Sequence, residues 1–308
     1  MSLKSLNIPV IDFVGRRKYA MIFSAILLIV SIASIGFQGL KFGIDFTGGT
    51  LIELGYEKSA DLEGIRSKLA YADFKGANVQ YFGSDTEVLI QLEPQATSSA
   101  KLSSSIIRML GEGIDVRRVE FVGPKVGEEL TNDGGLAMLY ALIGILIYVA
   151  FRFEYRFALG SIAALIHDVI ITLGVFSLLQ IEFDLTVLAA ILAVIGYSLN
   201  DTIVVFDRIR ENFLASRQVE SGSIINEALN QTLSRTLMTS LTTLLVLFAL
   251  FYLGGEVIHS FAGALLIGVV IGTYSSIYVA SSTILAMGIS KEDMLPSEKE
   301  KKEIDARP

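Results

Sequence analysis

The sequence has 308 residues, of which 52% are hydrophobic and 19% are charged, and its formal net charge is −7. An ordinary soluble domain carries about 25% charged residues, so the composition departs from that class. The acidic balance offers no basic face for nucleic acid, and no nucleic-acid partner is expected. The absence of cysteine excludes disulfides, thiolate metal sites and a cysteine nucleophile.

Six apolar segments are each long enough to cross a bilayer as a helix, which takes about 20 mostly apolar residues. In chain order they are 19–38, 134–151, 158–179, 185–206, 233–253 and 259–287. Basic residues at 16–18 precede the first, as in a cleavable secretory signal, but its apolar run is longer than the usual core of such a signal. We therefore expect an uncleaved first span.

Lysine and arginine are unevenly distributed among the short loops. They occur before the first span, after the second and fourth spans, and in the tail, whereas loops 180–184 and 254–258 contain none. The positive-inside rule then predicts that both termini are cytoplasmic. Residues 1–18 are the predicted cytoplasmic N-terminus. Residues 288–308 are the predicted cytoplasmic tail, whose mixed Lys and Glu composition predicts disorder.

The long insertion at 39–133 has the pattern of a folded domain on the outer side, which is the periplasm in a bacterium. Strands are predicted at 50–56, 77–82, 87–92 and 115–122, and helices at 61–71 and 101–110. The order β-α-β-β-α-β is typical of ferredoxin-like domains. The predicted fold is an α-helical membrane protein, in which this periplasmic α+β domain separates the first span, 19–38, from five further spans at 134–287. A short amphipathic helix near 224–229 is expected to lie along the membrane.

Two ionisable residues inside the predicted spans are informative, because a charge near mid-bilayer costs at least about 2.5–3.5 kcal/mol. Asp201 lies in the fourth span, in a polar group with Tyr197, Ser198 and Asn200. Arg235 lies near the start of the fifth span, with Thr239 one turn further on. The two spans run in opposite directions, so we expect Asp201 and Arg235 at similar depth, paired directly or through water. A proton relay is one interpretation; a packing pair, or an arginine that extends to the interface, is the other.

His167 and Asp168 in the third span are a second candidate for a proton pathway, because imidazole titrates near neutral pH. Adjacent helical residues point about 100° apart, so a packing hydrogen bond is an equal alternative.

Two histidines far apart and no cysteine make a metal site unexpected. The sequence has no phosphate-binding GxxxxGK[ST] motif. We expect no cofactor, and any work done would draw on an ion gradient. Gly268 and Gly272 form a GxxxG that predicts close helix packing.

Four segments resemble signatures of the SecD/SecF family of protein-export membrane proteins, in the resistance-nodulation-division superfamily. They are GIDFTGGT at 43–50, FVGPKVGEEL at 121–130, YSLNDTIVVFDRIREN at 197–212 and NQTLSRT at 230–236. The resemblance extends from about residue 10 to 290 and implies a multi-pass protein of the bacterial inner membrane that is not an enzyme. It also implies that this six-span half pairs with SecD. The pair would use protons as coupling ion to assist a translocating preprotein on the periplasmic side, after the SecA ATPase and the SecYEG translocon have started its passage.

The family's intramembrane acid and arginine correspond to Asp201 and Arg235. The mechanism we expect is that protonation of Asp201 weakens its pairing with Arg235, and that the bundle then shifts between two packings. Gly43, Gly48 and Gly49 would form the hinge to the outer domain, and Asp45 between them is expected to be a turn or cap residue. Two alternatives are a superfamily exporter of a small solute or lipid, and a non-transporting scaffold of a membrane complex.

Overall fold

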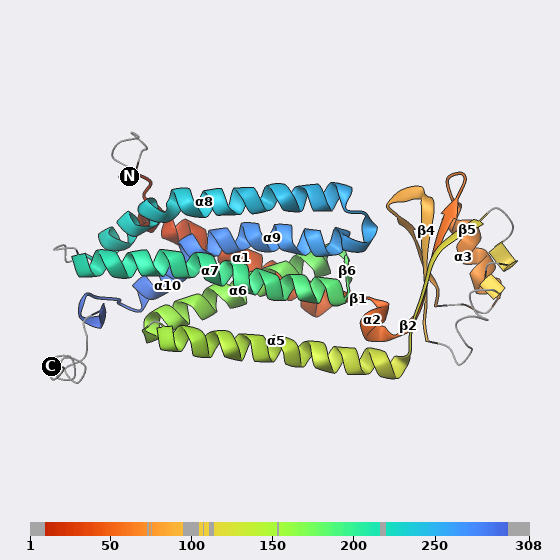
Figure 1. Ribbon diagram of the computed structural model, residues 1–308, viewed down its shortest axis with the longest axis horizontal. Coiled ribbons are helices and arrows are strands. Elements are labelled where there is room, and N and C mark those ends of the chain that lie inside the picture. Colours follow the sequence, from red (N-terminus) through yellow and green to blue (C-terminus); the bar gives the residue numbers. More distant parts are fainter. Residues whose placement is uncertain are drawn as a thin grey trace, which may run out of the picture.

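The computed structural model describes residues 10–72, 74, 76–94, 105–106, 108–110, 114–152, 154–215 and 220–294. Long helices form a bundle with an α+β domain at one end, and both ends of the described chain lie at the other (Figure 1). The helices of the bundle are α1 (Phe13–Gln38), α5 (Pro124–Arg152), α6 (Tyr155–Leu179), α7 (Leu185–Ala215), α8 (Ser221–Leu253) and α9 (His259–Ser275). A π-helical turn, η3 (Ser276–Ala280), joins α9 to α10 (Ser281–Ala286), and a short 3-10 turn, η2 (Glu256–Ile258), precedes α9.

The six predicted spans are confirmed, because six helices of the described chain are long and apolar enough to cross a membrane. Several of the helices are longer than the predicted spans: α1 begins at Phe13 rather than at 19, α7 ends at Ala215 rather than at 206, and α8 begins at Ser221 rather than at 233. The second span begins at Pro124 rather than at 134, directly after the last strand of the outer domain. The separate surface helix predicted near 224–229 is wrong: Ile224, Ile225, Ala228 and Leu229 are buried against the bundle and form the first turns of the continuous α8.

The outer domain confirms the predicted ferredoxin-like order. Its strands are β2 (Gly49–Tyr56), β3 (Asn78–Phe82), β4 (Ser84–Leu92) and β5 (Ile114–Val122), in the antiparallel order β3-β4-β2-β5. Helix α3 (Leu62–Tyr71) begins at Asp61, whose carboxylate accepts a hydrogen bond from the Gly64 N–H at 3.1 Å. The described residues of the second predicted helix, 105–106 and 108–110, are helical. The core is formed by fully buried apolar side chains, among them Ile52, Leu54, Leu69, Val88 and Ile90.

Helix α1 is packed in the manner of a membrane helix. Its buried residues include Ser24, Ser31 and Ser34, while most of its large apolar side chains are exposed. Ser34 shares a hydrogen bond of 2.9 Å with Ser177 of α6. Lipid solvates the apolar face, so small hydroxyl residues are free to make the close contacts between helices. The same logic confirms the predicted GxxxG contact, since a side chain at Gly268 would overlap Val194 of α7.

Two short elements connect the outer domain to the bundle. Strand β1 (Lys41–Phe42) pairs in parallel with β6 (Glu182–Phe183), which lies between α6 and α7. Helix α2 (Ile44–Thr47) follows, and the Asp45 carboxylate accepts a hydrogen bond of 3.0 Å from the Leu185 N–H at the start of α7. Asp45 thus binds the first N–H of α7 from a distant part of the chain, while Asp184, which directly precedes α7, accepts from the Val187 N–H at 2.8 Å.

Gly48 and Gly49 lie between α2 and the rest of β2, where the chain passes from the bundle into the outer domain. Their φ angles are +70° and +134°, a region that residues with a side chain rarely adopt. A Cβ on Gly48 would lie 3.1 Å from the Pro124 backbone, and one on Gly49 would overlap the Leu92 carbonyl. Glycine therefore lets β2 start directly beside the beginning of α5. Gly43 differs, with an ordinary extended backbone at φ −74°.

The described part of the C-terminal tail is folded, so the prediction of disorder is wrong for residues 288–294. Asp293, in the 3-10 turn η4 (Glu292–Met294), forms an ion pair with Arg156 at the start of α6 and accepts hydrogen bonds from Ser290. Burial raises the pKa of the Asp293 carboxyl, but the Ser290 hydrogen bonds and the Arg156 charge outweigh it and hold this pKa below its ordinary value. Residues 295–308 lie outside the described residues.

A pH dependence of stability follows from Glu182 at the junction, which lines a cavity of about 440 Å³ with Lys41, Asp45 and Asp184. Burial raises the pKa of Glu182 above its ordinary value of 4.5, while Lys41 opposes the shift and the two aspartates add to it. An acid with a raised pKa in the folded state binds its proton more tightly there, so stability falls as pH rises through that pKa. We expect Glu182→Gln to raise the thermal midpoint of the full chain in detergent at neutral pH, with the gain shrinking as the pH falls toward about 4.5 and smallest below it.

The control for this prediction is Glu129→Gln, which removes an exposed carboxylate on α5 and should leave the midpoint unchanged. An equal shift for Glu182→Gln at acidic and neutral pH would contradict the assignment.

Candidate functional site

Asp201 is buried in the middle of the bundle, with 6% of its surface exposed. Its carboxylate accepts one hydrogen bond of 3.0 Å from the Thr236 hydroxyl of α8 and another of 2.9 Å from the Ser276 hydroxyl of η3. Both oxygens are thus occupied by neutral donors from two other helices. Burying a carboxylate at this depth costs free energy, because lipid offers no hydrogen-bond donors. The two hydroxyl hydrogen bonds offset that cost.

Arg235 does not form the predicted direct pair with Asp201: within the described residues no ion pair joins them, and this prediction is corrected. The next residue, Thr236, faces Asp201, and a shift of one residue turns a side chain by about 100° around the helix. Arg235 is exposed and lines a cavity of about 440 Å³ between α7 and α8. Contact between the two residues through water remains a prediction.

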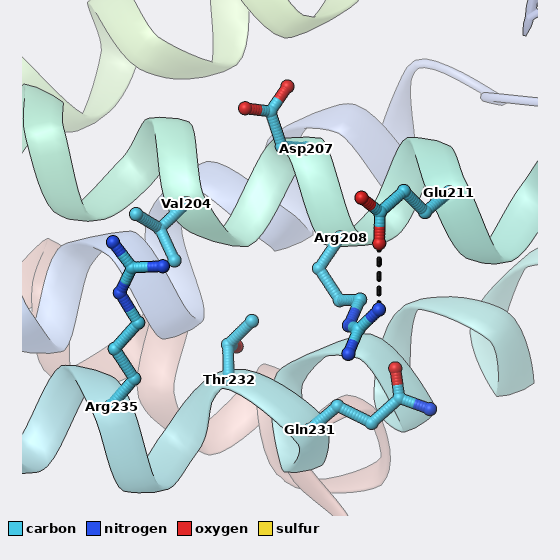
Figure 2. Close-up of a pocket in the computed structure, with 7 residues that line it drawn as sticks. All are labelled: Val204, Asp207, Arg208, Glu211, Gln231, Thr232 and Arg235. Carbon is cyan, nitrogen blue, oxygen red and sulfur yellow. Dashed lines mark hydrogen bonds and ion pairs between the residues drawn. The ribbon is translucent and has the colours of Figure 1, made fainter.

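This cavity is polar on both walls (Figure 2). It is lined by Val204, Asp207, Arg208, Glu211, Gln231, Thr232 and Arg235, and Arg208 is paired with Glu211 at 2.7 Å. Thr232 and Val204 lie about one helical turn from Thr236 and Asp201, toward the end of the bundle that holds both chain ends. The cavity therefore brings water-accessible polar groups within one turn of the buried carboxylate.

His167 and Asp168 form a second buried polar centre, with 2% and 1% of their surfaces exposed. The His167 Nδ1 lies 2.9 Å from Asp168 Oδ1, although the two are adjacent on α6. The other oxygen, Oδ2, accepts hydrogen bonds from Ser198 at 2.5 Å and Ser275 at 2.7 Å. The Nε2 of His167 is buried and has no hydrogen-bond partner among the described residues. The expected packing hydrogen bond is present, and a role in proton transfer stays a prediction.

The two carboxylates are connected through consecutive residues. Ser275 donates to Asp168 and Ser276 donates to Asp201, so a single peptide unit serves acids on two different helices. The π-helical turn η3 begins at Ser276, and such turns are frequent at functional sites. One backbone segment of the last span therefore holds both carboxylates.

The predicted supporting residues do not all surround Asp201. Ser198 donates to Asp168 instead, and Tyr197 donates to Ser240 at 3.3 Å. Asn200 is exposed, and the Thr239 hydroxyl donates to carbonyls of its own helix. Three donors escaped the sequence reasoning: Ser275, Ser276 and Thr236. The one feature of the sequence that could have pointed to them is that they are polar residues, next to other polar residues, inside apolar spans.

Metal binding receives no support from the described part of the chain, where no three His, Cys, Asp or Glu side chains gather as ligands. What the geometry offers is a pair of buried carboxylates with hydroxyl donors and a histidine, next to a polar cavity. Such a set can take up, hold and release protons, because each carboxyl exchanges between acceptor and donor forms.

The fold and the site define a class: a six-span membrane protein with an α+β domain after the first span and buried acids in its third and fourth spans. A family model described as "Protein export membrane protein SecD/SecF, C-terminal" matches residues 103–290, and one for the SecD/SecF GG motif matches residues 33–60. The chain is 54% identical to "Protein translocase subunit SecF" of Vibrio alginolyticus, over 97% of each protein. It is 46% identical to the subunit of the same name from Pseudomonas aeruginosa, over 99% of this chain and 100% of that protein. The chain belongs to the SecD/SecF family, as a SecF subunit.

The solved structures agree with this assignment. The crystal structure of SecDF from Thermus thermophilus matches 93% of this chain with a TM-score of 0.85 and 40% identity. A crystal structure of SecDF in a super-membrane-facing form matches 97% with a TM-score of 0.68 and 38% identity. This chain covers 39% and 40% of those two chains. The range matched by the GG-motif model contains Gly48 and Gly49, whose positive φ angles favour glycine.

Replacing Asp168 tests the second polar centre. Asp168→Leu removes the acceptor for Ser198 and Ser275 and the partner of His167, so we expect the full chain in detergent to lose about 1–3 kcal/mol of stability. Asp168→Asn keeps one acceptor oxygen and should cost clearly less. Asn200→Leu, on the exposed face of α7, is the matched control and should be nearly neutral. Equal midpoints for Asp168→Leu and Asp168→Asn would show that these hydrogen bonds contribute nothing.

Proposed function

We propose that this chain acts with SecD to assist protein export through the Sec pathway, driven by protons that move down their gradient across the bacterial inner membrane. Family membership supports the export role, because relatives carry the name protein translocase subunit and one SecDF is described as translocon-associated. SecD would supply the remaining spans of a SecDF-like assembly, and SecYEG and the translocating preprotein are the further partners that we propose. Both termini would be cytoplasmic, in accord with the positive-inside rule.

The observation that carries proton coupling is the environment of Asp201. An ionised carboxylate accepts from both Thr236 and Ser276, whereas a protonated one has an O–H donor on one oxygen. The hydroxyl facing that oxygen can then turn around and accept from the new O–H, which reverses the direction of the hydrogen bond. Protonation therefore changes the contacts that α7 makes with α8 and η3. No cation is paired directly with Asp201 in the described structure, so no salt bridge has to break first.

The cavity beside Arg235 suggests the route on the cytoplasmic side. Water in this cavity would reach the helical turn that precedes Thr236. The positive charge of Arg235 at the cavity wall would repel a proton and so keep it from staying in the cavity. His167 and Asp168 would form a second station, reached through Ser275 and Ser276. In this proposal Arg235 acts through the cavity rather than as a locked partner of Asp201.

The outer domain would be the part that moves. It is attached at its start through α1, β1 and α2 and at its end through α5, and Gly43, Gly48 and Gly49 are the proposed hinge. Two SecDF structures match this chain with TM-scores of 0.85 and 0.68 at nearly equal identity, 40% and 38%. This supports more than one arrangement of the same elements within the family, as a switch between two packings requires.

The central test of the proposal is Asp201→Asn, which keeps the shape of the side chain but cannot cycle between charged and neutral forms. In proteoliposomes that contain this chain, SecD and SecYEG, with SecA and ATP outside, we expect the variant to reduce preprotein translocation to the level seen without a proton gradient. Proton flux, followed with a pH-sensitive dye inside the vesicles, should be lost as well.

The control is Glu129→Gln, which removes an exposed carboxylate on α5 and should keep both activities. Gradient-dependent translocation at the wild-type level in Asp201→Asn would refute proton coupling through this residue and favour a scaffold.

A further inference from the structure

Helix α1 has a polar attachment to the last span near the middle of the bundle. The Tyr274 hydroxyl of α9 lies 2.6 Å from the Ala20 carbonyl oxygen and 2.9 Å from the Ser24 Oγ. A phenol has a single proton, so Tyr274 donates to the Ala20 carbonyl and accepts from Ser24. Ser24 is buried although it lies on a helix that exposes most of its surface. These two bonds join α1 to α9.

The ring of Tyr274 faces the second polar centre. It stacks on the His167 ring with centroids 6.0 Å apart and an angle of 28° between the planes. His167 in turn is bonded to Asp168. The tyrosine therefore contacts the acid-bearing helix α6 with its ring and α1 with its hydroxyl.

Three consecutive residues of the last span contact three different helices. Tyr274 bonds α1, Ser275 bonds Asp168 of α6, and Ser276 bonds Asp201 of α7. The π-helical turn starts at the third of them. A displacement of Ser276 when Asp201 changes its protonation is passed directly along the backbone to Tyr274.

We propose that Tyr274 is the positioning residue that transmits the state of the buried carboxylates to α1, and through α1 to the outer domain. This inference rests on the proposed function, and it concerns coupling rather than proton movement. Tyr274 exchanges no proton with either carboxylate; it holds α1 in the position that the Ser275–Ser276 peptide dictates. Because α1 runs directly into β1 and α2, the chain itself carries a shift of α1 against α6 to the outer domain, past the contacts that β1 makes with β6 and Asp45 makes with α7.

The test variant is Tyr274→Phe, which keeps the ring and its stack on His167 but removes both hydrogen bonds to α1. The matched control is Tyr278→Phe, one turn further along the same span, because the Tyr278 hydroxyl makes no hydrogen bond within the described residues. Both variants are compared with wild type and Asp201→Asn in the proteoliposomes containing SecD and SecYEG. Proton flux and preprotein translocation are measured in the same vesicles.

We expect Tyr274→Phe to conduct protons at the wild-type level and to lose the stimulation of translocation by the gradient. Ser24→Ala, which leaves the bond to Ala20, should lose part of the stimulation, and Tyr278→Phe none. A purely structural role would instead lower flux and stimulation together, in step with a lower thermal midpoint.

The outcomes separate this inference from the proposed function. Wild-type stimulation in Tyr274→Phe, with both activities lost in Asp201→Asn, would overturn the inference alone. Loss of flux together with stimulation in Tyr274→Phe would also overturn it, since the residue would then belong to the proton path or to the packing. Unchanged activity in Asp201→Asn would remove the proposed function itself.

Discussion

A carboxylate inside a membrane span has to receive its hydrogen bonds from the protein, because the surrounding hydrocarbon offers none. This chain places two such groups, Asp168 and Asp201, on neighbouring helices. Asp201 is satisfied by two hydroxyls, and Asp168 by two hydroxyls together with the His167 ring. The packing around these two acids meets that requirement. Gly268 lets α9 approach Val194 of α7 closely, and the π-helical turn begins where the donors are needed. Some of the contacts between helices are thus also the contacts that hold the two acids.

Hydroxyl donors give these acids a property that a salt bridge would lack. A neutral donor can reverse its bond when the carboxyl gains a proton, so the change in charge becomes a change in the direction of hydrogen bonds. Tyr274, Ser275 and Ser276 are consecutive, and they hold α1, α6 and α7 in turn. The part of the last span that senses the acids is therefore also the part that positions the helix leading to the outer domain. In the proposed mechanism, a small change at the acids would become a relative movement of whole elements.

The sequence was sufficient for the six spans and for the strand order of the outer domain, because apolar run length and alternation are local properties. It also singled out Asp201 from the cost of its burial alone. It failed on the Asp201–Arg235 pair, since one residue along a helix redirects a side chain by about 100°. The donors Ser275 and Ser276 were out of reach because their acids lie 107 and 75 residues away in the chain. The two-residue strands β1 and β6 are too short to show a pattern.

The central claim is that Asp201 gains and loses a proton and that Ser276 responds. Infrared difference spectroscopy of the full-length protein, assembled with SecD in lipid, tests it most directly. The account predicts a carboxyl C=O band whose intensity changes with pH. The change should fall between the pH values found on the two sides of a membrane that carries a proton gradient. This band should be absent in Asp201→Asn and should shift in frequency in Ser276→Ala. A spectrum in which Asp201 contributes no pH-dependent band, or one identical in wild type and Ser276→Ala, would contradict the account.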